Sequence, residues 1–426
     1  MTPSADGPTT LSPARTRFAL LALALGGFGI GLSEFVAMGL LPFLASDLLP
    51  ELSASDNDQA LAQAGWLISA YAFGVVVGAP TVAAFSARFP RKQLLMVLVA
   101  FFVGGTILSA SLPTFELVLA ARFLTALPHG AYFGVAALVA AELMGPGNRG
   151  RGVAFVLGGL TISNVVGVPF VTWLGQVSGW RASYFVVAGV FAATFFAIWL
   201  AVPLQAGDRN ATMRNELKAF TKLQVWMALA IGAIGFGGLF AVYTYISPLV
   251  TEVTGLPLSV VPIALIVVGI GMTVGNFFGG WYADRGIARS VIVFFIAMFV
   301  ALAGLIVLAD TTVGLFVFLF LVGAAAAALS PAIQVRLMDV AGDSKTIAAA
   351  VNHASLNLGN ALGAFLGGVT IAAGFGFLSP AWVGLVMTVS GLVIALISFG
   401  IDRVRDHGPS GGVPTTENPI ISPVGS

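Results

Sequence analysis

The sequence predicts an all-α membrane protein with twelve transmembrane helices in two pseudo-symmetric six-helix bundles. Three observations predict it: an apolar composition, twelve apolar segments of spanning length, and a basic loop pattern that occurs once in each half. Hydrophobic residues make up 58% of the 426 residues and charged residues only 9%, against about 25% in soluble proteins. The mean hydropathy is +0.99. A chain of this composition cannot cover itself with a polar surface, so we expect it to lie in a bilayer.

The apolar runs are much longer than the alternating segments of an outer-membrane barrel, so we expect the spans to be helices. Charges, prolines and polar clusters separate the runs from one another. The expected limits are residues 18–44, 61–86, 93–111, 115–142, 150–177, 182–203, 223–250, 258–282, 289–309, 312–338, 346–373 and 379–401. The chain contains no cysteine, which excludes disulfides and thiol chemistry.

The basic residues predict the side of the membrane that each loop faces. With the N-terminus in the cytoplasm, 17 of the 19 Lys and Arg residues fall in cytoplasmic segments. The other two are Arg122, within a span, and Arg181, at an outer end. The first outer loop, residues 46–60, carries four acids and no base. This positive-inside pattern, with an even number of spans, predicts that both termini are cytoplasmic.

The longest connection follows the sixth span and divides the chain into two halves. The expected organisation is a disordered cytoplasmic N-tail at 1–17, a bundle at 18–204, a cytoplasmic linker at 205–222, a second bundle at 223–405 and a disordered tail at 406–426. The third, sixth, ninth and twelfth spans lack Gly pairs four residues apart and have almost no polar residues. We therefore expect these four spans to lie outermost against lipid.

A basic loop pattern follows the second and the eighth spans, as "AAFSARFPRKQLL" (83–95) and "GWYADRGIARSVI" (280–292). "LAARFLTALPHGAYFG", "GGLTISNVVGVPFVTWLG", "GWRASYF" and "NLGNALGAFLGG" are further characteristic stretches. With these stretches, residues 18–405 resemble the major facilitator superfamily, specifically its twelve-span drug:proton antiporters near the arabinose-efflux and chloramphenicol-resistance permeases. The family's loop motif is matched in the first copy by Arg88, Arg91 and Lys92 and in the second by Gly280, Asp284 and Arg285.

The resemblance implies two bundles around a central cavity, alternating access by rocking, and coupling to the proton gradient. It also implies that the two loops help to hold one conformation. In the first copy, however, Ala83, Ala87 and Pro90 replace the motif's glycines and aspartate. Without the aspartate, the contact that it makes in the family is missing or replaced, so the first loop is not assigned a gating role.

The candidate proton-coupling residues are Glu34, Arg122 and His129. Glu34 lies within the first span, where an acid normally faces a protein interior or a wet cavity. Arg122 and His129 are seven residues apart, on nearly one face of the fourth span, and they bracket the depth of Glu34. Desolvation favours the protonated carboxyl and a nearby guanidinium favours the carboxylate, so Glu34 is expected to titrate in a physiological range. The structural alternatives are a static ion pair or a hydrogen-bonded structural acid for Glu34, and a hydrogen-bonded packing histidine for His129.

The candidate substrate-cavity residues are polar and aromatic side chains of other spans: Asn164, Phe236, Phe240, Tyr243, Gln334 and Asn357. Tyr245, Asn276, Asn352, His353 and Asn360 are further polar residues that could line the cavity. Hydrogen bonds between helices are the alternative for each asparagine, and ordinary packing for the aromatic residues. His353 is interpreted as structural because it lies about two turns from the cytoplasmic end of its span.

The predicted function is proton-coupled efflux of a small organic molecule, such as a drug, across a bacterial inner membrane. The expected partners are the substrate, protons and the bilayer, with no nucleic acid, no metal and no cofactor, and the chain is expected to be a monomer. No phosphate-binding Gly-Lys-Ser/Thr loop is present, so neither ATP hydrolysis nor another enzymatic activity is expected. A sugar or nutrient symporter or facilitator is one alternative, and a non-transporting membrane sensor is another.

Overall fold

The computed structural model describes residues 12–86, 89–145, 147–205, 221–341 and 345–406. Within these ranges every regular element is helical, and twelve helices are long and apolar enough to cross a membrane. This confirms the predicted all-α fold with twelve spans. Most of the predicted tails and of the linker, together with Arg88, lie outside the described residues.

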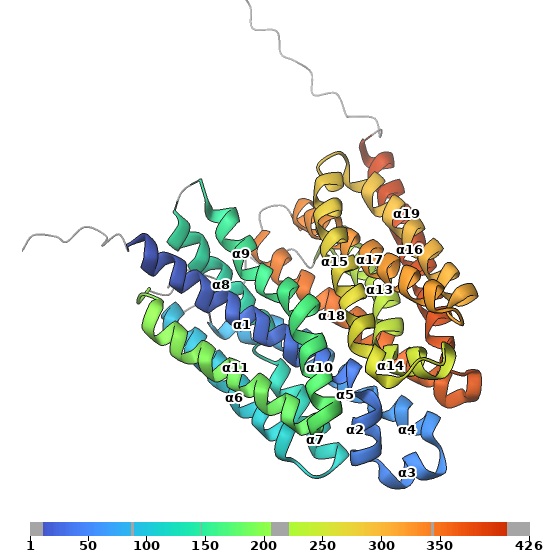
Figure 1. Cartoon of the computed structure of the whole chain (residues 1–426). Coiled ribbons are helices and arrows are strands. Elements are labelled where there is room, and N and C mark those ends of the chain that lie inside the picture. The colour runs from blue at the N-terminus through green and yellow to red at the C-terminus, as the bar shows by residue number, and fades with distance from the viewer. Residues whose placement is uncertain (1–11, 87–88, 146, 206–220, 342–344, 407–426) are drawn as a thin grey trace, which may run out of the picture.

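The first bundle contains six spans and two further short helices. The spans are α1 (Pro13–Gly39), α4 with α5 (Asn57–Ala64, Trp66–Ser86), α6 (Arg91–Ser111), α7 with α8 (Phe115–Ala126, His129–Met144), α9 with η1 and α10 (Arg149–Ile162, Ser163–Gly167, Val168–Ser178) and α11 (Trp180–Ala201). The short helices α2 (Leu41–Leu48) and α3 (Pro50–Ser55) lead from α1 to α4. Figure 1 shows α6 and α11 on the outer flank of this bundle.

The second bundle repeats this arrangement. Its spans are α13 (Leu223–Thr244), α15 (Val261–Ala283), α16 (Ile287–Leu308), α17 (Thr312–Ala341), α18 with η5 (Lys345–Thr370, Ile371–Phe375) and α19 (Ser379–Asp406). The short elements α14 (Ile246–Pro248), η3 (Leu249–Val253) and η4 (Leu258–Val260) follow α13. Here α16 and α19 lie on the outer flank (Figure 1), as the absence of Gly pairs four residues apart in these spans predicted.

The start of α1 and its end near Leu40 differ from the expected limits for physical reasons. The helix begins at Pro13, before the expected residue 18, because the Ser12 hydroxyl caps it and proline suits the first helical position. It stops at Leu40, just before Pro42, and α2 continues in a new direction. The corresponding span of the second bundle, α13, stops at Tyr245, just before Pro248.

The two bundles meet at the end that carries α2, α3 and α4, which we call the closed end, and spread apart toward the end where α1 begins and α19 ends (Figure 1). At the closed end the Gln176 amide of α10 donates to the Leu258 carbonyl, at 3.0 Å. The Ser69 hydroxyl of α5 donates to the Ala361 carbonyl of α18, at 3.2 Å. These bonds join one bundle to the other.

Candidate functional site

Glu34 lies in the C-terminal part of α1, where that helix meets the second bundle. The residue is only 5% exposed, and its Oε1 accepts a hydrogen bond from Nδ2 of Asn360 on α18, at 3.2 Å. The two residues are 326 positions apart in the sequence and belong to different bundles. The carboxyl group of the first span is thus held directly by the opposite half of the molecule.

A cavity of about 240 Å³ lies between the bundles, next to Glu34. Both halves line it, which is the arrangement expected for a central pathway. The lining residues are Glu34, Phe35, His129, Leu157, Leu160, Thr161 and Asn164 from the first half, and Phe236, Phe240, Gly269, Met272, Thr273, Asn276, Ala327, Ser330, Pro331, Gln334, Asn352, His353, Leu356 and Asn357 from the second. Among these described residues Glu34 is the only carboxylate, and none is Lys or Arg.

Three phenylalanine rings form a continuous aromatic cluster at the cavity. The rings of Phe35 and Phe240 are stacked with centroids 6.2 Å apart, and Phe236 lies 5.5 Å from Phe240. Tyr243 packs against the outer side of this cluster, 5.8 Å from the Phe35 ring, and is not among the described residues that line the cavity. Tyr243 lies one turn after Phe240 on α13, where it contacts the Phe35 ring but does not reach the cavity.

Arg122 is fully buried on α7, but its guanidinium donates hydrogen bonds to backbone carbonyls rather than to a carboxylate. Nη1 donates to the Ser33 carbonyl at 2.5 Å, and longer bonds of 3.5 Å reach the carbonyls of Glu34 and Leu67. The guanidinium also lies over the Tyr71 ring, 4.4 Å from its centroid. Within the described residues, Arg122 neither lines the cavity nor forms an ion pair with the Glu34 side chain.

His129 begins α8 immediately after Pro128, which interrupts the fourth span. Its ring lies on the cavity wall, with Nδ1 3.5 Å from the Tyr71 hydroxyl. The Phe133 ring lies between two imidazoles, 5.4 Å from His129 and 5.6 Å from His353 of the other bundle, and it stacks on His353 at an interplanar angle of 4°. His353 therefore lines the cavity and contacts the first half.

The predicted amide residues Asn164, Gln334 and Asn357 all reach the cavity, together with Asn276 and Asn352. Asn164 is placed there by η1, a single π-helical turn inside the fifth span, of the kind that often marks functional sites. The Oδ1 atoms of Asn164, Asn352 and Asn357 are buried without a hydrogen-bond partner in the described part of the chain. A buried acceptor left unpaired is costly, so these atoms are available to accept hydrogen bonds from water or from a bound molecule.

The described loop residues, which exclude Arg88, do not line the cavity and make contacts within their own bundles. Arg91 forms an ion pair with Glu142 at 2.6 Å, and the Lys92 ammonium donates to the Trp199 carbonyl at 2.6 Å. In the second copy, Gly280 and Asp284 lie at the end of α15. Arg285 donates to the Trp281 carbonyl at 2.8 Å and lies over the Trp281 ring.

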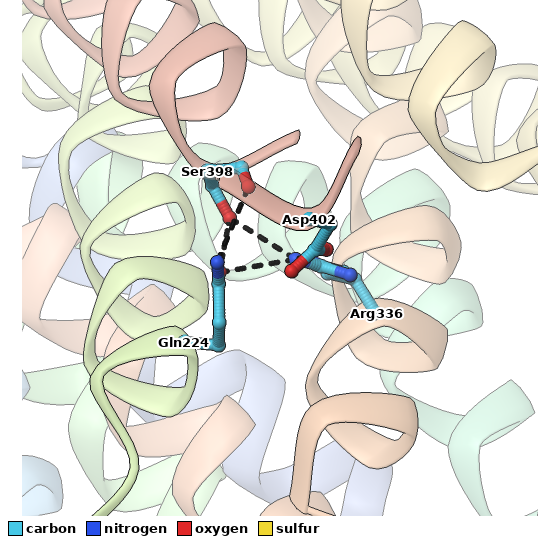
Figure 2. Close-up of polar contacts among 4 residues, drawn as sticks. All are labelled: Gln224, Arg336, Ser398 and Asp402. Carbon is cyan, nitrogen blue, oxygen red and sulfur yellow. Dashed lines mark hydrogen bonds and ion pairs between the residues drawn. The ribbon is translucent and has the colours of Figure 1, made fainter. Parts of the chain in front are cut away.

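A polar cluster joins α13, α17 and α19 of the second bundle (Figure 2). Nη2 of Arg336 donates to Gln224 and Ser398 at 3.1 Å each and to Asp402 at 2.5 Å. The Ser398 hydroxyl in turn donates to Gln224 at 2.6 Å. The cluster ties these three helices together at the end opposite the closed end.

The sequence assigned no central role to Asn360, Phe35 or His353. Asn360 had a detectable signal, because it lies between Gly359 and Gly363 on the close-packing face of its helix. Phe35 carried no signal among the 33 phenylalanines of the chain. Within the described residues, no group of three or more His, Asp and Glu side chains is arranged to hold a metal ion.

Comparisons with known proteins agree with this architecture. The family model of the Major Facilitator Superfamily matches residues 23–346 and 268–423. The chain is 36% identical over 383 residues to the inner membrane transport protein YdhP of Escherichia coli (strain K12), covering 90% of this chain and 96% of that protein. It is 32% identical over 379 residues to a chloramphenicol resistance protein of Streptomyces lividans, covering 88% and 94%.

A crystal structure of a D-xylose-proton symporter has the same fold, with a TM-score of 0.71 at 16% identity over 90% of this chain and 97% of that one. The family match, the relatives and the twelve spans identify a multi-pass membrane transporter rather than an enzyme. The chain belongs to the major facilitator superfamily.

Proposed function

We propose that this protein exports a small organic molecule from the bacterial cytoplasm in exchange for protons, by alternating access across the inner membrane. The observation that carries the proposal is Glu34, the only carboxylate among the described cavity-lining residues, at the junction of the two bundles. A titrating acid there changes the charge of the pathway itself. Protonation shifts the balance between two orientations only if they solvate the carboxyl differently, and a position between the moving halves meets this condition.

The proposed orientation in the membrane rests on the positive-inside pattern, which predicts that both termini are cytoplasmic. The closed end then faces the outside, and the described state opens toward the cytoplasm. In the rest of the proposed cycle, a proton reaches Glu34 from the outside and leaves to the inside, while the substrate travels in the opposite direction.

The cavity lining favours an uncharged or weakly cationic substrate with an apolar part. No described lining residue is Lys or Arg, so an anion would meet no ammonium or guanidinium group there, whereas the aromatic cluster of Phe35, Phe236 and Phe240 offers a stacking surface. Chloramphenicol is a suitable first probe because a relative is named for resistance to it. Expression in an efflux-deficient host should raise the inhibitory concentration of at least one compound in a panel that includes chloramphenicol.

The deciding experiment uses purified protein in liposomes with a transported compound and a pH-sensitive dye. The wild-type protein should release protons when substrate binds, and Glu34→Gln should abolish this release. Glu116→Gln is the matched control, because Glu116 is an exposed acid in the first turn of α7. Unchanged proton release in Glu34→Gln would remove Glu34 from the coupling step.

Uptake of a sugar or another polar nutrient is the second candidate, and the five amide side chains of the lining favour it. Asn164, Asn276, Gln334, Asn352 and Asn357 offer donors and acceptors that suit hydroxyl groups. An imposed pH gradient separates the two candidates. Protons and substrate move in opposite directions in export and in the same direction in symport.

A further inference from the structure

The contact between Glu34 and Asn360 has an unused hydrogen-bonding capacity. Asn360 is only 1% exposed, and its Nδ2 donates to Oε1 of Glu34. Its Oδ1 is buried without a partner in the described part of the chain. The Asn360 amide therefore donates through Nδ2 to the Glu34 carboxyl group, while its acceptor Oδ1 remains unused.

A carboxylate and a carboxylic acid meet this amide differently. An ionised carboxyl only accepts hydrogen bonds, so it takes the bond from Nδ2 and leaves Oδ1 unpaired beside a negative charge. A protonated carboxyl has an O–H that can donate to Oδ1 while its other oxygen keeps the bond from Nδ2. The proton thus converts a single bond into a cyclic acid–amide pair with two bonds.

We propose that Asn360 senses the proton on Glu34 and converts it into a stronger bond between the bundles. The pair lies between α1 and α18, so the second hydrogen bond exists only while the two helices remain in contact. Protonation of Glu34 then stabilises the conformation described here, with its closed end shut, and loss of the proton weakens it. This inference rests on the proposed role of Glu34 as the proton carrier.

Other titratable and charged groups lie around Glu34, but the hydrogen bond to its side chain comes from Asn360. Tyr71, Tyr243 and Arg122 interact with the Glu34 charge from α5, α13 and α7. Arg122 is bonded to backbone carbonyls. His129 and His353 line the same cavity. Within the described residues the carboxyl group has one side-chain hydrogen bond, and its donor is Asn360.

The absence of cysteine allows a direct test by spin labelling of the full-length protein in lipid nanodiscs. Labels at Ala54→Cys on α3 and Thr312→Cys at the start of α17 lie at exposed positions of the closed end, one on each bundle. Pulsed electron paramagnetic resonance then measures the distribution of distances between them from pH 5 to pH 9. In the wild-type background we expect the ratio of closed to open protein to fall as the pH rises.

Three variants in this background isolate the contribution of Asn360. Asn360→Leu removes both amide functions at similar volume, and Asn360→Ala provides a smaller replacement if leucine prevents folding. Both should reduce the pH-dependent change in the closed-to-open ratio by about two- to tenfold, the effect of one net hydrogen bond. Glu34→Gln presents a permanent donor and acceptor to Asn360, so it should remain closed at every pH.

Ser69→Ala is the matched control, because it removes a bond between the bundles that contains no titratable group. It should shift the closed-to-open ratio equally at every pH and keep the pH dependence. A full pH response in both Asn360 variants, together with its loss in Glu34→Gln, would overturn the role of Asn360 and leave Glu34 as the carrier. A wild-type protein without any pH response would instead contradict the proposed function.

Discussion

Arg122 places a buried positive charge beside Glu34 without forming an ion pair with it. The Arg122 guanidinium is 1% exposed and is satisfied by carbonyl oxygens of Ser33, Glu34 and Leu67 and by the face of Tyr71. A buried charge is tolerated when hydrogen bonds and ring faces replace its water. Arg122 thereby fixes the backbone that carries Glu34 and leaves the carboxyl group free to meet Asn360.

Arg122→Lys should show that the shape of the guanidinium matters in addition to its charge. A lysine keeps the positive charge but lacks the planar fork, so it cannot reach carbonyls of both α1 and α5. We expect a loss of about 1–3 kcal/mol in stability and at least a tenfold fall in transport rate. Thermal unfolding in detergent and uptake into liposomes measure the two effects. Arg91→Lys, at a partly exposed ion pair, should change stability by less than about 1 kcal/mol.

Several spans are interrupted at defined residues. The first span stops at Leu40 and the seventh at Tyr245, so both bundles change direction at corresponding places near the closed end. The π-helical turn Ser163–Gly167 brings Asn164 to the cavity. Between these interruptions the helices are regular and pack against their neighbours, and small residues let neighbouring helices approach closely.

Packing of α15 on α17 should be sensitive to a single glycine. A side chain at Gly275 would run into the backbone of Ala324 on α17, which cannot move aside. Gly275→Leu should therefore separate the two helices and prevent accumulation of folded protein. Gly104→Leu is the matched control, since Gly104 is an exposed position of α6 with open space around it. Fluorescence size-exclusion chromatography of tagged variants measures the folded fraction, and equal yields would contradict this role.

The polar cluster of the second bundle should contribute to its stability. Arg336→Met removes the donor that joins α17 to α13 and α19, and it leaves the Asp402 carboxylate without its ion pair. We expect a loss of about 1–3 kcal/mol in the free energy of unfolding, because Arg336 is 12% exposed and little screened by water. Asp402→Asn keeps a hydrogen-bond acceptor for Arg336 and should cost less. Thermal unfolding followed by tryptophan fluorescence distinguishes the two variants.

At the scale of the whole molecule, composition and segment length were enough to predict the fold. Twelve apolar runs and a repeated loop define twelve spans in two halves, because a bilayer permits few alternatives. Five of the six predicted cavity residues line the cavity, and Tyr243 is the exception. The contacts of Arg122 and Asn360 could not be predicted, because helical period tells which residues share a face but not how that face turns within a bundle.

The proposed alternating access requires the closed end to open once in every cycle. The bond between Gln176 and Leu258 joins α10 to the start of the eighth span there, and both residues are partly exposed. A reversible thiol cross-linker between Gln176→Cys and Leu258→Cys should hold the bundles together at this end. We expect transport into liposomes to fall at least tenfold on cross-linking and to return after reduction.

The matched control for this cross-link is a pair at the same end within one bundle. Asp47 and Arg181 form an ion pair inside the first half, and both are partly exposed. Because rocking moves each bundle as a unit, a cross-link between Asp47→Cys and Arg181→Cys should leave the transport rate unchanged. Loss of transport in both pairs would show that motion within the first bundle is required. Normal transport in the cross-linked Gln176–Leu258 pair would exclude opening at this end.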